Sequence, residues 1–516
     1  MPNTFLSRAA CGLLFIQAFL TSFASAHPTV PRCFQNYPSS PHNISVPAIQ
    51  KELGHLLSKG SVIFGPSDPR WHNTTDGFQE LSPPDVEIVV QPGKESDISK
   101  IVKYCNEKSI KYLALNRKHG WSSTLGGFKG MQIDMTSLSS LTIQPDNKSA
   151  IIQGGAYLGE VIDTLWDAGY VAVTGSSACP GFVGPALGGG HGRYEGLYGL
   201  ASDNVIRLNM VLADGSKIQV SKSSHSDLFW GMKGAGQNFG IVTSAEAKIY
   251  PREIDTWHYH NYIWTQDKLE TLFETLNIYH GNGTTPARMG VNHGIYMIDP
   301  SISKTEAVLS WTFAYAGPAE EAEKILQPFN DIEAVSHVSG DVSYPELVEI
   351  QGTGLSSPVC YHGDHPVSSA LLRTWNITTQ RQIYDMFNEK VALYPELANT
   401  AILLETYATK GMSDIPAHTS AYPWREELHI VLFFASLEPG SDLLEPTQQW
   451  AQETRDLWHA GEPTLPPRTY MNYGAGIETP EEMYGYEPWR LEKLRGLKSK
   501  YDPHNQFRYY NSFVKN

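Results

Sequence analysis

The first residues suited to binding chemistry lie in a short loop after a predicted strand. Residues 116–121 read Asn-Arg-Lys-His-Gly-Trp and follow directly on the strand expected at residues 110–115. A backbone that leaves a strand through a glycine-containing turn can direct consecutive N–H groups at one point and so form an anion-binding nest. The loop therefore predicts a site for a diphosphate group. Its histidine, His119, is by itself ambiguous, because a lone loop histidine is usually a hydrogen-bonding or exposed residue.

A second candidate is the glycine-rich segment at residues 175–192, GSSACPGFVGPALGGGHG. Glycine is entropically costly to order, and such density is usually tolerated where a flat ligand or another backbone lies too close for any Cβ. Both explanations are open for this segment.

The elements around these loops follow from hydrophobic periodicity. After Pro83-Pro84, residues 86–90 predict a strand, and Ser96 or Asp97 can cap a helix in which Ile98, Ile101, Val102 and Cys105 have helical spacing. With the strand at 110–115 they predict a β-α-β unit. The pattern recurs at 151–153, where a strand leads through Gly154-Gly155 into a helix containing Leu158, Val161, Ile162 and Leu165.

Later segments predict more sheet. Residues 205–212 and 217–220 flank Ala-Asp-Gly-Ser, a hairpin signal, and 239–250 predict a strand that ends the first lobe at Pro251. The region from about 253 to 460 mixes strands, such as 307–315 and 428–434, with amphipathic helices such as 319–326. This alternation predicts an α+β lobe.

Composition limits the class of protein. The chain has 516 residues, 41% of them hydrophobic, which is enough for two lobes with real cores and argues against disorder. A formal net charge of -15 disfavours binding to nucleic acid or to anionic membranes. No segment after the N-terminus is apolar enough to cross a bilayer.

The N-terminus predicts export. Arg8, an apolar run and Ala24-Ser25-Ala26 are typical of a signal peptide over residues 1–26, with a mature chain from His27. The alternative, an N-terminal anchor, is disfavoured because Gln17 interrupts a run that is short for a span. Five glycosylation sequons stand at Asn43, Asn73, Asn147, Asn282 and Asn376. Together these features predict a glycoprotein secreted to the medium or sent through the secretory pathway to a vacuole.

Two further motifs are rejected as binding sites. Residues 234–239, GAGQNF, lack the third glycine of a dinucleotide fingerprint and precede a strand, which disfavours a Rossmann nicotinamide site. The cluster His362, Asp364 and His365 lacks regular zinc spacing and is interpreted as solvated loop residues. No metal is predicted.

Four ordered motifs resemble one family. The loop with His119, residues 184–204 (GPALGGGHGRYEGLYGLASDN), residues 227–243 (DLFWGMKGAGQNFGIVT) and residues 501–513 (YDPHNQFRYYNSF) are similar to the berberine bridge enzyme-like flavoproteins, which have the p-cresol methylhydroxylase type of FAD-binding domain. The resemblance covers most of residues 80–252 and about 465–516, and the middle lobe is similar only in outline.

The resemblance implies an α+β fold with a two-part FAD-binding lobe and a substrate lobe built on an antiparallel sheet backed by helices. The expected organisation is a signal peptide (1–26), an N-terminal segment (27–80), the FAD-binding domain (81–252), the substrate domain (253–460) and a C-terminal segment that returns to the FAD domain (461–516). The substrate would lie between the lobes.

The cofactor implied is FAD, bonded from His119 to the C8α methyl carbon of the flavin. Lys118 departs from the family, which commonly has glycine there, although an ammonium beside a diphosphate would be favourable. The cysteine of bicovalent members falls on Ser177, two residues from Cys179, so one covalent link is expected. The FAD-binding residues carried over are Arg117, Lys118, His119, Gly120, Trp121, Gly154, Gly175, Ser176, Ser177, Gly184, Gly189, Gly190, His191, Gly192, Ile241, Tyr510 and Asn511.

The four cysteines of the mature chain allow three pairings. The resemblance implies that Cys33 and Cys105 form the family's N-terminal disulfide, the alternative being two buried thiols. Cys179 and Cys360 are left open as a pair or as free thiols.

The implied reaction is that of an FAD-linked oxidase: a small organic substrate of secondary metabolism gives hydride to the flavin, and dioxygen reoxidises it to yield hydrogen peroxide. A base must also take the substrate's O–H or N–H proton. The candidates are Glu405, Tyr407, Tyr470 and Tyr473, with packing as the alternative for the aromatic residues, and His191 is a further neighbour of the ring. A redox-silent cyclase and a binding glycoprotein with an empty flavin lobe are the rival functions.

Overall fold

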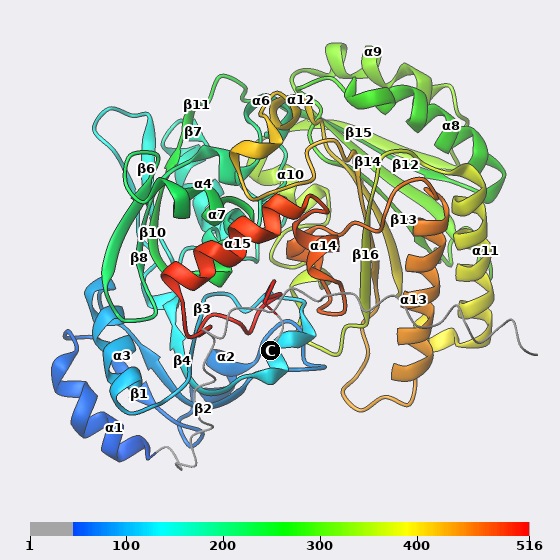
Figure 1. Cartoon of the computed structure of the whole chain (residues 1–516). Helices are drawn as coiled ribbons and strands as arrows, with labels where there is room; N and C mark the ends of the chain where they lie inside the picture. The colour runs from blue at the N-terminus through cyan, green and yellow to red at the C-terminus, as the bar shows by residue number, and fades with distance from the viewer. Residues whose placement is uncertain (1–44, 515–516) are drawn as a thin grey trace, which may run out of the picture.

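A computed structural model describes residues 45–514 of the chain. The predicted signal peptide, Cys33 and Asn43 lie outside the described residues. The sheets of the first half of the chain and the large sheet of the second half stand side by side, and the chain then returns to the first half through α15, Pro488–Tyr501 (Figure 1).

The first sheet has four strands in the order β1-β2-β4-β3: β1 (Val62–Phe64), β2 (Asp85–Gln91), β4 (Lys129–Asp134) and β3 (Tyr112–Leu115). The predicted strands at 86–90 and 110–115 are present, but β4 lies between them and pairs in parallel with both. The helix between them, α3 (Glu95–Glu107), begins earlier than predicted. Lys94 is its N-cap, and Asp97, three residues later, accepts the Lys94 backbone N–H at 3.2 Å.

The second sheet is antiparallel, in the order β5-β6-β10-β8-β9: β5 (Leu141–Ile143), β6 (Ser149–Gln153), β10 (Ile241–Lys248), β8 (Val205–Val211) and β9 (Lys217–Ser221). The predicted hairpin is β8-β9, closed by a hydrogen bond from Leu212 N–H to the Ser216 carbonyl. Gly215 takes φ +81°, which a β-carbon would disfavour. The predicted helix after Gly154-Gly155 is α4 (Leu158–Asp167), and α7 (Ser226–Ala235) packs in the same core.

The large sheet has seven antiparallel strands in the order β15-β12-β14-β13-β17-β18-β16. Four helices cover one face (Figure 1), and their apolar residues form a core with Trp264, Trp311 and Phe433 of the strands. The strands are β12 (Trp257–Trp264), β13 (Asn292–Met297), β14 (Val308–Ala316), β15 (Ser336–Val342), β16 (Val367–Leu372), β17 (Ala401–Thr406) and β18 (His429–Phe434), and the helices are α8 (Leu269–His280), α9 (Ala319–Asn330), α11 (Ile377–Leu393) and α13 (Leu444–Ala460). The predicted α+β fold is therefore confirmed.

Period-2 alternation gives this sheet two different faces. Ile402 and Leu404 of β17 pack in the helix-side core, whereas Leu403 and Glu405 face the other way, toward the first half of the chain. That second face provides one wall of the candidate site.

The C-terminal residues close the molecule onto its first half. Leu491, Leu494 and Leu497 of α15 join the core that contains Phe229 and Trp230 of α7. The remaining helices are α1 (Val46–Leu53), α2 (Trp71–Thr75), α5 (Val183–Leu187), α6 (Glu195–Tyr198), α10 (Tyr344–Ile350), α12 (Lys410–Ser413) and α14 (Pro480–Tyr484), and β7 (Tyr170–Val171) pairs with β11 (Tyr250–Pro251).

The cysteines settle one open question. Cys179 and Cys360 form a disulfide with Cα atoms 5.8 Å apart. Within residues 45–514, Cys105 is a free thiol with no exposed surface, packed among Ile98, Ile101 and Met131. Its expected partner, Cys33, lies outside the described residues, so the Cys33–Cys105 bridge stays a prediction.

Three predicted glycosylation sites are accessible: Asn73, Asn147 and Asn376 are exposed. No described helix has the length and apolar character needed to span a membrane.

Candidate active site

A cavity of about 1360 Å³ lies between the first lobe and the seven-stranded sheet. Its walls are the loop 116–121, the segment 175–185, and side chains of β13, β17 and β18. It exceeds the ~300–1,000 Å³ of ordinary ligand pockets, so it has room for a large cofactor and a substrate together.

His119 stands in the cavity wall and is held on two sides. One ring nitrogen, Nε2, lies 2.7 Å from the carbonyl oxygen of Val359, and the ring stacks on Phe78 at 4.2 Å between centroids. Burial lowers the pKa of His119 to about 4, which keeps the imidazole neutral. Because a neutral imidazole has one N–H, donation from Nε2 to Val359 leaves the Nδ1 lone pair as the nucleophilic position.

The Lys118 side chain differs from the expectation that its ammonium lies beside a diphosphate. Its φ of 54° is a left-handed conformation that favours glycine, the residue common at this position in the similar family. Its Nζ donates to the carbonyls of Asn73 and Thr74, both at 2.9 Å, at the end of α2. The ammonium therefore neutralises a helix C-terminus and does not reach toward a diphosphate in the cavity.

The glycines of Gly-Gly-Gly-His-Gly are explained by protein packing and do not touch the cavity. A Cβ on Gly192 would lie 1.7 Å from the Thr174 carbonyl oxygen, one on Gly189 would meet the ring of Tyr422, and one on Gly190 would meet Ala201. Of the two explanations left open by the sequence, the close approach of protein atoms holds here.

Asn511 is also outside the cavity wall, since its side chain bonds to Ser122 Oγ and to the Met471 carbonyl. Gly189, Gly190, Gly192 and Asn511 therefore do not line this cavity. The other predicted FAD-binding residues line the cavity: Arg117, Lys118, His119, Gly120, Trp121, Gly154, Gly175, Ser176, Ser177, Gly184, His191, Ile241 and Tyr510.

The disulfide bears on the number of covalent links. Ser177 Oγ lies 3.4 Å from Cys179 Sγ, and that sulfur is bonded to Cys360. Neither position offers a thiol to a cofactor. The bridge also joins the glycine-rich segment to the short turn Pro358–Cys360, which carries the Val359 carbonyl that meets His119.

Glu405 is a buried carboxyl group in the opposite wall. It lies on β17 with 8% of its surface exposed, and its carboxylate accepts hydrogen bonds from Tyr473 OH at 3.1 and 3.3 Å and from Tyr407 OH at 3.4 Å. Burial raises the pKa of Glu405 to about 7, opposed by the Tyr473 hydrogen bond and by His191. The carboxyl group can therefore take up or release a proton near neutrality.

The three tyrosines around Glu405 differ in their partners. Tyr407 OH lies 3.0 Å from Ser176 Oγ, and Tyr473 packs against Trp121 at 5.5 Å, which connects Glu405 to the loop of His119. Tyr470 oxygen accepts from the backbone N–H groups of Gly190 and His191 and from Asn472. Burial raises the pKa of each phenol, so all three are neutral donors at ordinary pH.

His191 lines the cavity, but both of its ring nitrogens already have hydrogen-bond partners. Nδ1 lies 2.7 Å from Glu195 Oε2, and Nε2 lies 2.7 Å from Tyr422 OH. Its ring also meets Tyr470 edge-on at 4.8 Å. It is therefore placed to position Tyr470 and not to exchange a proton with a substrate.

The interpretation of His362, Asp364 and His365 as solvated is wrong for two of the three. His362 is exposed, but Asp364 and His365 are buried, because the segment crosses beneath Phe78 and pairs with Leu437. His365 stacks on Phe78 at 4.4 Å and lies 3.1 Å from the Ala435 carbonyl, so it extends the aromatic wall around His119.

Sequence reasoning missed several polar residues of the cavity. Asn116 Oδ1, Gln237 Oε1 and Tyr509 OH are buried, line the cavity and have no protein partner. Unpaired buried polar atoms are costly, so these three fit a ligand with polar groups along its length, as a dinucleotide has. No spacing rule marks them, although Asn116 and Gln237 lie inside the motifs that carried the resemblance.

Comparisons with known proteins agree with this site. Residues 86–221 match the FAD binding domain family, and residues 469–513 match the family described as berberine and berberine like. The FAD-linked oxidoreductase iacH of Pestalotiopsis fici is 52% identical over 510 residues, 98% of each chain. The FAD-linked oxidoreductase anuG of Penicillium roqueforti is 49% identical over 473 residues, 92% of this chain and 93% of that one.

Solved structures share the fold at lower identity. The xylooligosaccharide oxidase of Myceliophthora thermophila C1 has a TM-score of 0.78 at 20% identity, covering 91% of this chain and 99% of that one. The glucooligosaccharide oxidase of Acremonium strictum, described with a 6-S-cysteinyl, 8α-N1-histidyl FAD, has a TM-score of 0.75 at 22% identity, covering 91% and 100%. With relatives this similar over their whole length, the chain belongs to the berberine bridge enzyme-like FAD-linked oxidoreductases and is an FAD-dependent enzyme.

Proposed function

We propose that this enzyme is an oxidase that binds FAD through one covalent bond from His119 and oxidises a small, largely apolar organic molecule. The observation that carries the proposal is the shared cavity in which His119 and Glu405 stand in opposite walls, Glu405 with a pKa near 7. When bound, FAD accepts a hydride from a substrate carbon and passes two electrons to dioxygen, which yields hydrogen peroxide.

The cofactor-holding role falls to the loops of the first lobe. His119 offers a neutral imidazole whose Nε2 is engaged by Val359, which favours attachment through Nδ1. Ser177 occupies the position of the second, cysteinyl link of bicovalent relatives, and Cys179 is consumed in a disulfide. These features support one link.

Glu405 takes the role of general base. A substrate that loses hydride from carbon must also lose the proton of its O–H or N–H group, and a carboxylate with a pKa near 7 is suited to accept it. Tyr473 and Tyr407 donate to the carboxylate and hold its orientation. The proton is then held on a Glu405 oxygen until it exchanges with solvent.

The sheet wall around Glu405 favours an apolar substrate. Five side chains on this face are apolar: Ile295, Met297, Leu403, Leu432 and Phe434. His293, which is paired with Glu405 across the strands, is a polar neighbour on the same face, and burial lowers its pKa to about 4. A sugar chain would need hydrogen-bond partners for many hydroxyls, which the five apolar residues do not supply. A small, largely hydrocarbon or aromatic alcohol of secondary metabolism fits this wall better than an oligosaccharide.

Passage through the secretory pathway, to the medium or a vacuole, is part of the proposal. The Cys179–Cys360 bridge suits an oxidising compartment, and the exposed Asn73, Asn147 and Asn376 could accept glycans. A mobility shift of the protein from its native host after endoglycosidase treatment would test this.

The covalent link is tested by tandem mass spectrometry of the tryptic peptide that contains His119. A peptide heavier by one flavin, together with loss of the yellow colour on acid precipitation of His119→Ala, is expected. An unmodified peptide from flavin-replete protein would contradict the link. A yellow protein whose colour never bleaches anaerobically with any apolar alcohol would contradict the oxidase function.

A further inference from the structure

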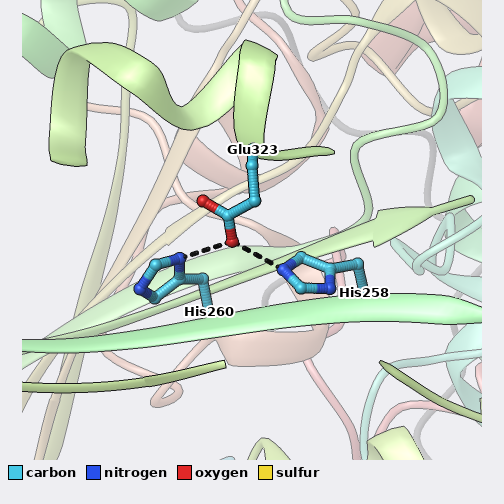
Figure 2. Close-up of side chains that lie close together, drawn as sticks. All are labelled: His258, His260 and Glu323. Carbon is cyan, nitrogen blue, oxygen red and sulfur yellow. Dashed lines mark hydrogen bonds and ion pairs between the residues drawn. The ribbon is translucent and has the colours of Figure 1, made fainter. Parts of the chain in front are cut away.

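A cluster of metal-ligand side chains lies on the far side of the seven-stranded sheet from the cavity. His258 and His260 of β12 and Glu323 of α9, named here the His258 cluster, converge in Figure 2, with one Glu323 oxygen facing both imidazoles. None of the three lines the cavity. The cluster therefore has no part in the proposed oxidation.

The fold brings the three together for local reasons. His258 and His260 are two residues apart on one strand, so their side chains lie on the same face. Helix α9 packs on that face through Ala322, Leu326 and Phe329, which places Glu323 over the histidines. The imidazoles are 3% and 4% exposed, whereas the Glu323 side chain is 32% exposed.

The geometry of the three ligand atoms is close to that of a bound ion. Glu323 Oε1 lies 2.7 Å from His258 Nε2 and 2.8 Å from His260 Nδ1, and all three atoms lie within 4.8 Å of one another. Zinc sits ~2.0–2.2 Å from nitrogen and carboxylate ligands, which puts neighbouring tetrahedral ligands about 3.3 Å apart. To admit the ion, the two oxygen–nitrogen separations would have to widen by about half an ångström each, and the two imidazole nitrogens, which lie within 4.8 Å of each other, would have to approach the same spacing.

The second nitrogen of each histidine is also engaged, as is usual for metal-binding imidazoles. His258 Nδ1 lies 2.6 Å from Asp341 Oδ1, and His260 Nε2 lies 3.2 Å from His337 Nδ1. A ligating histidine typically donates its other N–H to a carboxylate or another acceptor, which fixes the ring and its tautomer. Both partners come from β15, the edge strand paired with β12.

We propose that His258 Nε2, His260 Nδ1 and Glu323 Oε1 bind one divalent transition-metal ion of the zinc type. Two imidazoles and one carboxylate form a donor set that zinc and its neighbours accept, and water can complete the coordination on the exposed side of Glu323. The ion would connect α9 and, through Asp341 and His337, the edge strand β15 to β12. Its role is to stabilise this outer corner of the substrate lobe.

The competing explanation is a metal-free hydrogen-bonded cluster. In that case Glu323 is held by hydrogen bonds to His258 and His260, and no ion lies between them. The two explanations differ in a measurable way, since only the first predicts one equivalent of tightly held metal.

The test uses tag-free, flavin-containing enzyme dialysed with ZnCl₂ and then freed of loose metal by gel filtration. Elemental analysis should find one zinc per chain in the wild type and in Glu320→Gln, a control on the same helix whose carboxylate pairs only with exposed Lys324. Glu323→Gln and His258→Gln should lose that equivalent. Asp341→Asn should retain the site with affinity reduced about 10- to 100-fold.

Two further measurements keep the result interpretable. Co²⁺ in place of zinc should give d–d absorption at wavelengths beyond the flavin bands in the wild type but not in Glu323→Gln, and flavin absorbance shows that each variant is folded. Zinc should raise the unfolding temperature of the wild type and of Glu320→Gln but not that of Glu323→Gln or His258→Gln. No bound zinc, or equal zinc in wild type and Glu323→Gln, would overturn the proposal.

Discussion

At the scale of single residues, the chemistry is divided between two side chains whose properties come from burial. Burial keeps His119 neutral and so nucleophilic, while the same effect raises the pKa of Glu405 to about 7 and so makes it a base for neutral pH. Sequence patterns identified both residue types. They did not show which of Glu405, Tyr407, Tyr470 and Tyr473 is suited to be the base. That choice depends on burial and on which group accepts hydrogen bonds from the others, and neither is visible in the sequence.

The Glu405→Gln variant tests the base directly. Removing a general base costs ~10²–10⁴-fold in rate, so kcat should fall by about that factor while flavin content stays at the wild-type level. In the wild type, kcat/KM should rise with pH through about 7, where Glu405 loses its proton. Glu445→Gln, which changes an exposed carboxylate of α13, is the matched control. A variant that kept both the rate and the pH profile would show that another group is the base.

Glu405 also predicts how stability depends on pH. Its folded pKa, about 7, is above the ordinary 4.5, so the neutral acid is favoured by folding. Its contribution is therefore full below pH 4.5 and is lost as pH rises through 7. Glu405→Gln has no proton to lose, so its stability relative to the wild type should increase over this range, by ~3 kcal/mol at most. Thermal unfolding at several pH values checks this, and an unchanged difference would refute the pKa.

At the scale of elements, the disulfide and the glycine-rich segment position the cavity residues next to the loop of His119. Cys179 comes shortly after the cavity residues 175–177, and Cys360 ends the turn that presents Val359 to His119. The tight glycines further along, at 189, 190 and 192, let α5, Thr174 and Tyr422 approach one another. The sequence placed glycines near the site, but their neighbours come from segments distant along the chain.

Removal of the disulfide should impair flavin attachment. In Cys179→Ala/Cys360→Ala the turn with Val359 loses its anchor, and His119 loses part of the support that orients its ring. We expect a lower fraction of covalent flavin, measured by fluorescence of the denatured protein band, and a stability lower by ~2–5 kcal/mol. Cys105→Ala, which removes a thiol that forms no bridge within residues 45–514, should keep the wild-type flavin fraction. Full flavinylation of the double variant would contradict this role.

Gly192→Ala should destabilise the fold without any contact to the cofactor. The new Cβ would lie 1.7 Å from the Thr174 carbonyl oxygen, so the backbone has to move. The unfolding temperature should therefore drop both with and without flavin. Gly127→Ala is the control, since a Cβ added at Gly127 would have no other atom within 4 Å. A normal unfolding temperature for Gly192→Ala would mean that this packing is looser than described.

At the scale of the whole molecule, the cofactor lobe and the large sheet stand side by side (Figure 1). Residues of both line one cavity. The C-terminal residues complete the cavity wall. Tyr470, Asn472 and Tyr473, which line the cavity, come from the part of the chain that returns to the first lobe. His119 and Glu405, which are far apart in sequence, therefore share one space.

Binding of the cofactor in this cavity should stabilise the folded protein against unfolding. Binding to the folded state alone stabilises it by mass action, ~2.7 kcal/mol at a ligand concentration 100 times Kd. His119→Ala stripped of flavin should therefore unfold at a lower temperature than the wild type, and added FAD should restore part of the loss. Scanning calorimetry with and without FAD measures this. No response to FAD would show that the cavity does not take the cofactor.

The sequence by itself determined the fold class and the first candidate binding loop, the one that contains His119. Strand and helix periodicity, the turn at Gly215 and the loop of His119 are local signals, since each depends on residues close together in the chain. These predicted strands of each large sheet, the β8-β9 hairpin and the α+β fold correctly, and the family resemblance predicted an FAD-binding domain, which residues 86–221 match.

Only the tertiary structure decided which of these segments come into contact. It paired Cys179 with Cys360 and left Cys105 buried, held the Lys118 ammonium on the carbonyls of Asn73 and Thr74, and brought Glu323 of α9 onto the histidines of β12. It also singled out Glu405 among its neighbours. Burial, pKa and disulfide pairing depend on contacts between residues far apart in sequence, and no local pattern records those contacts.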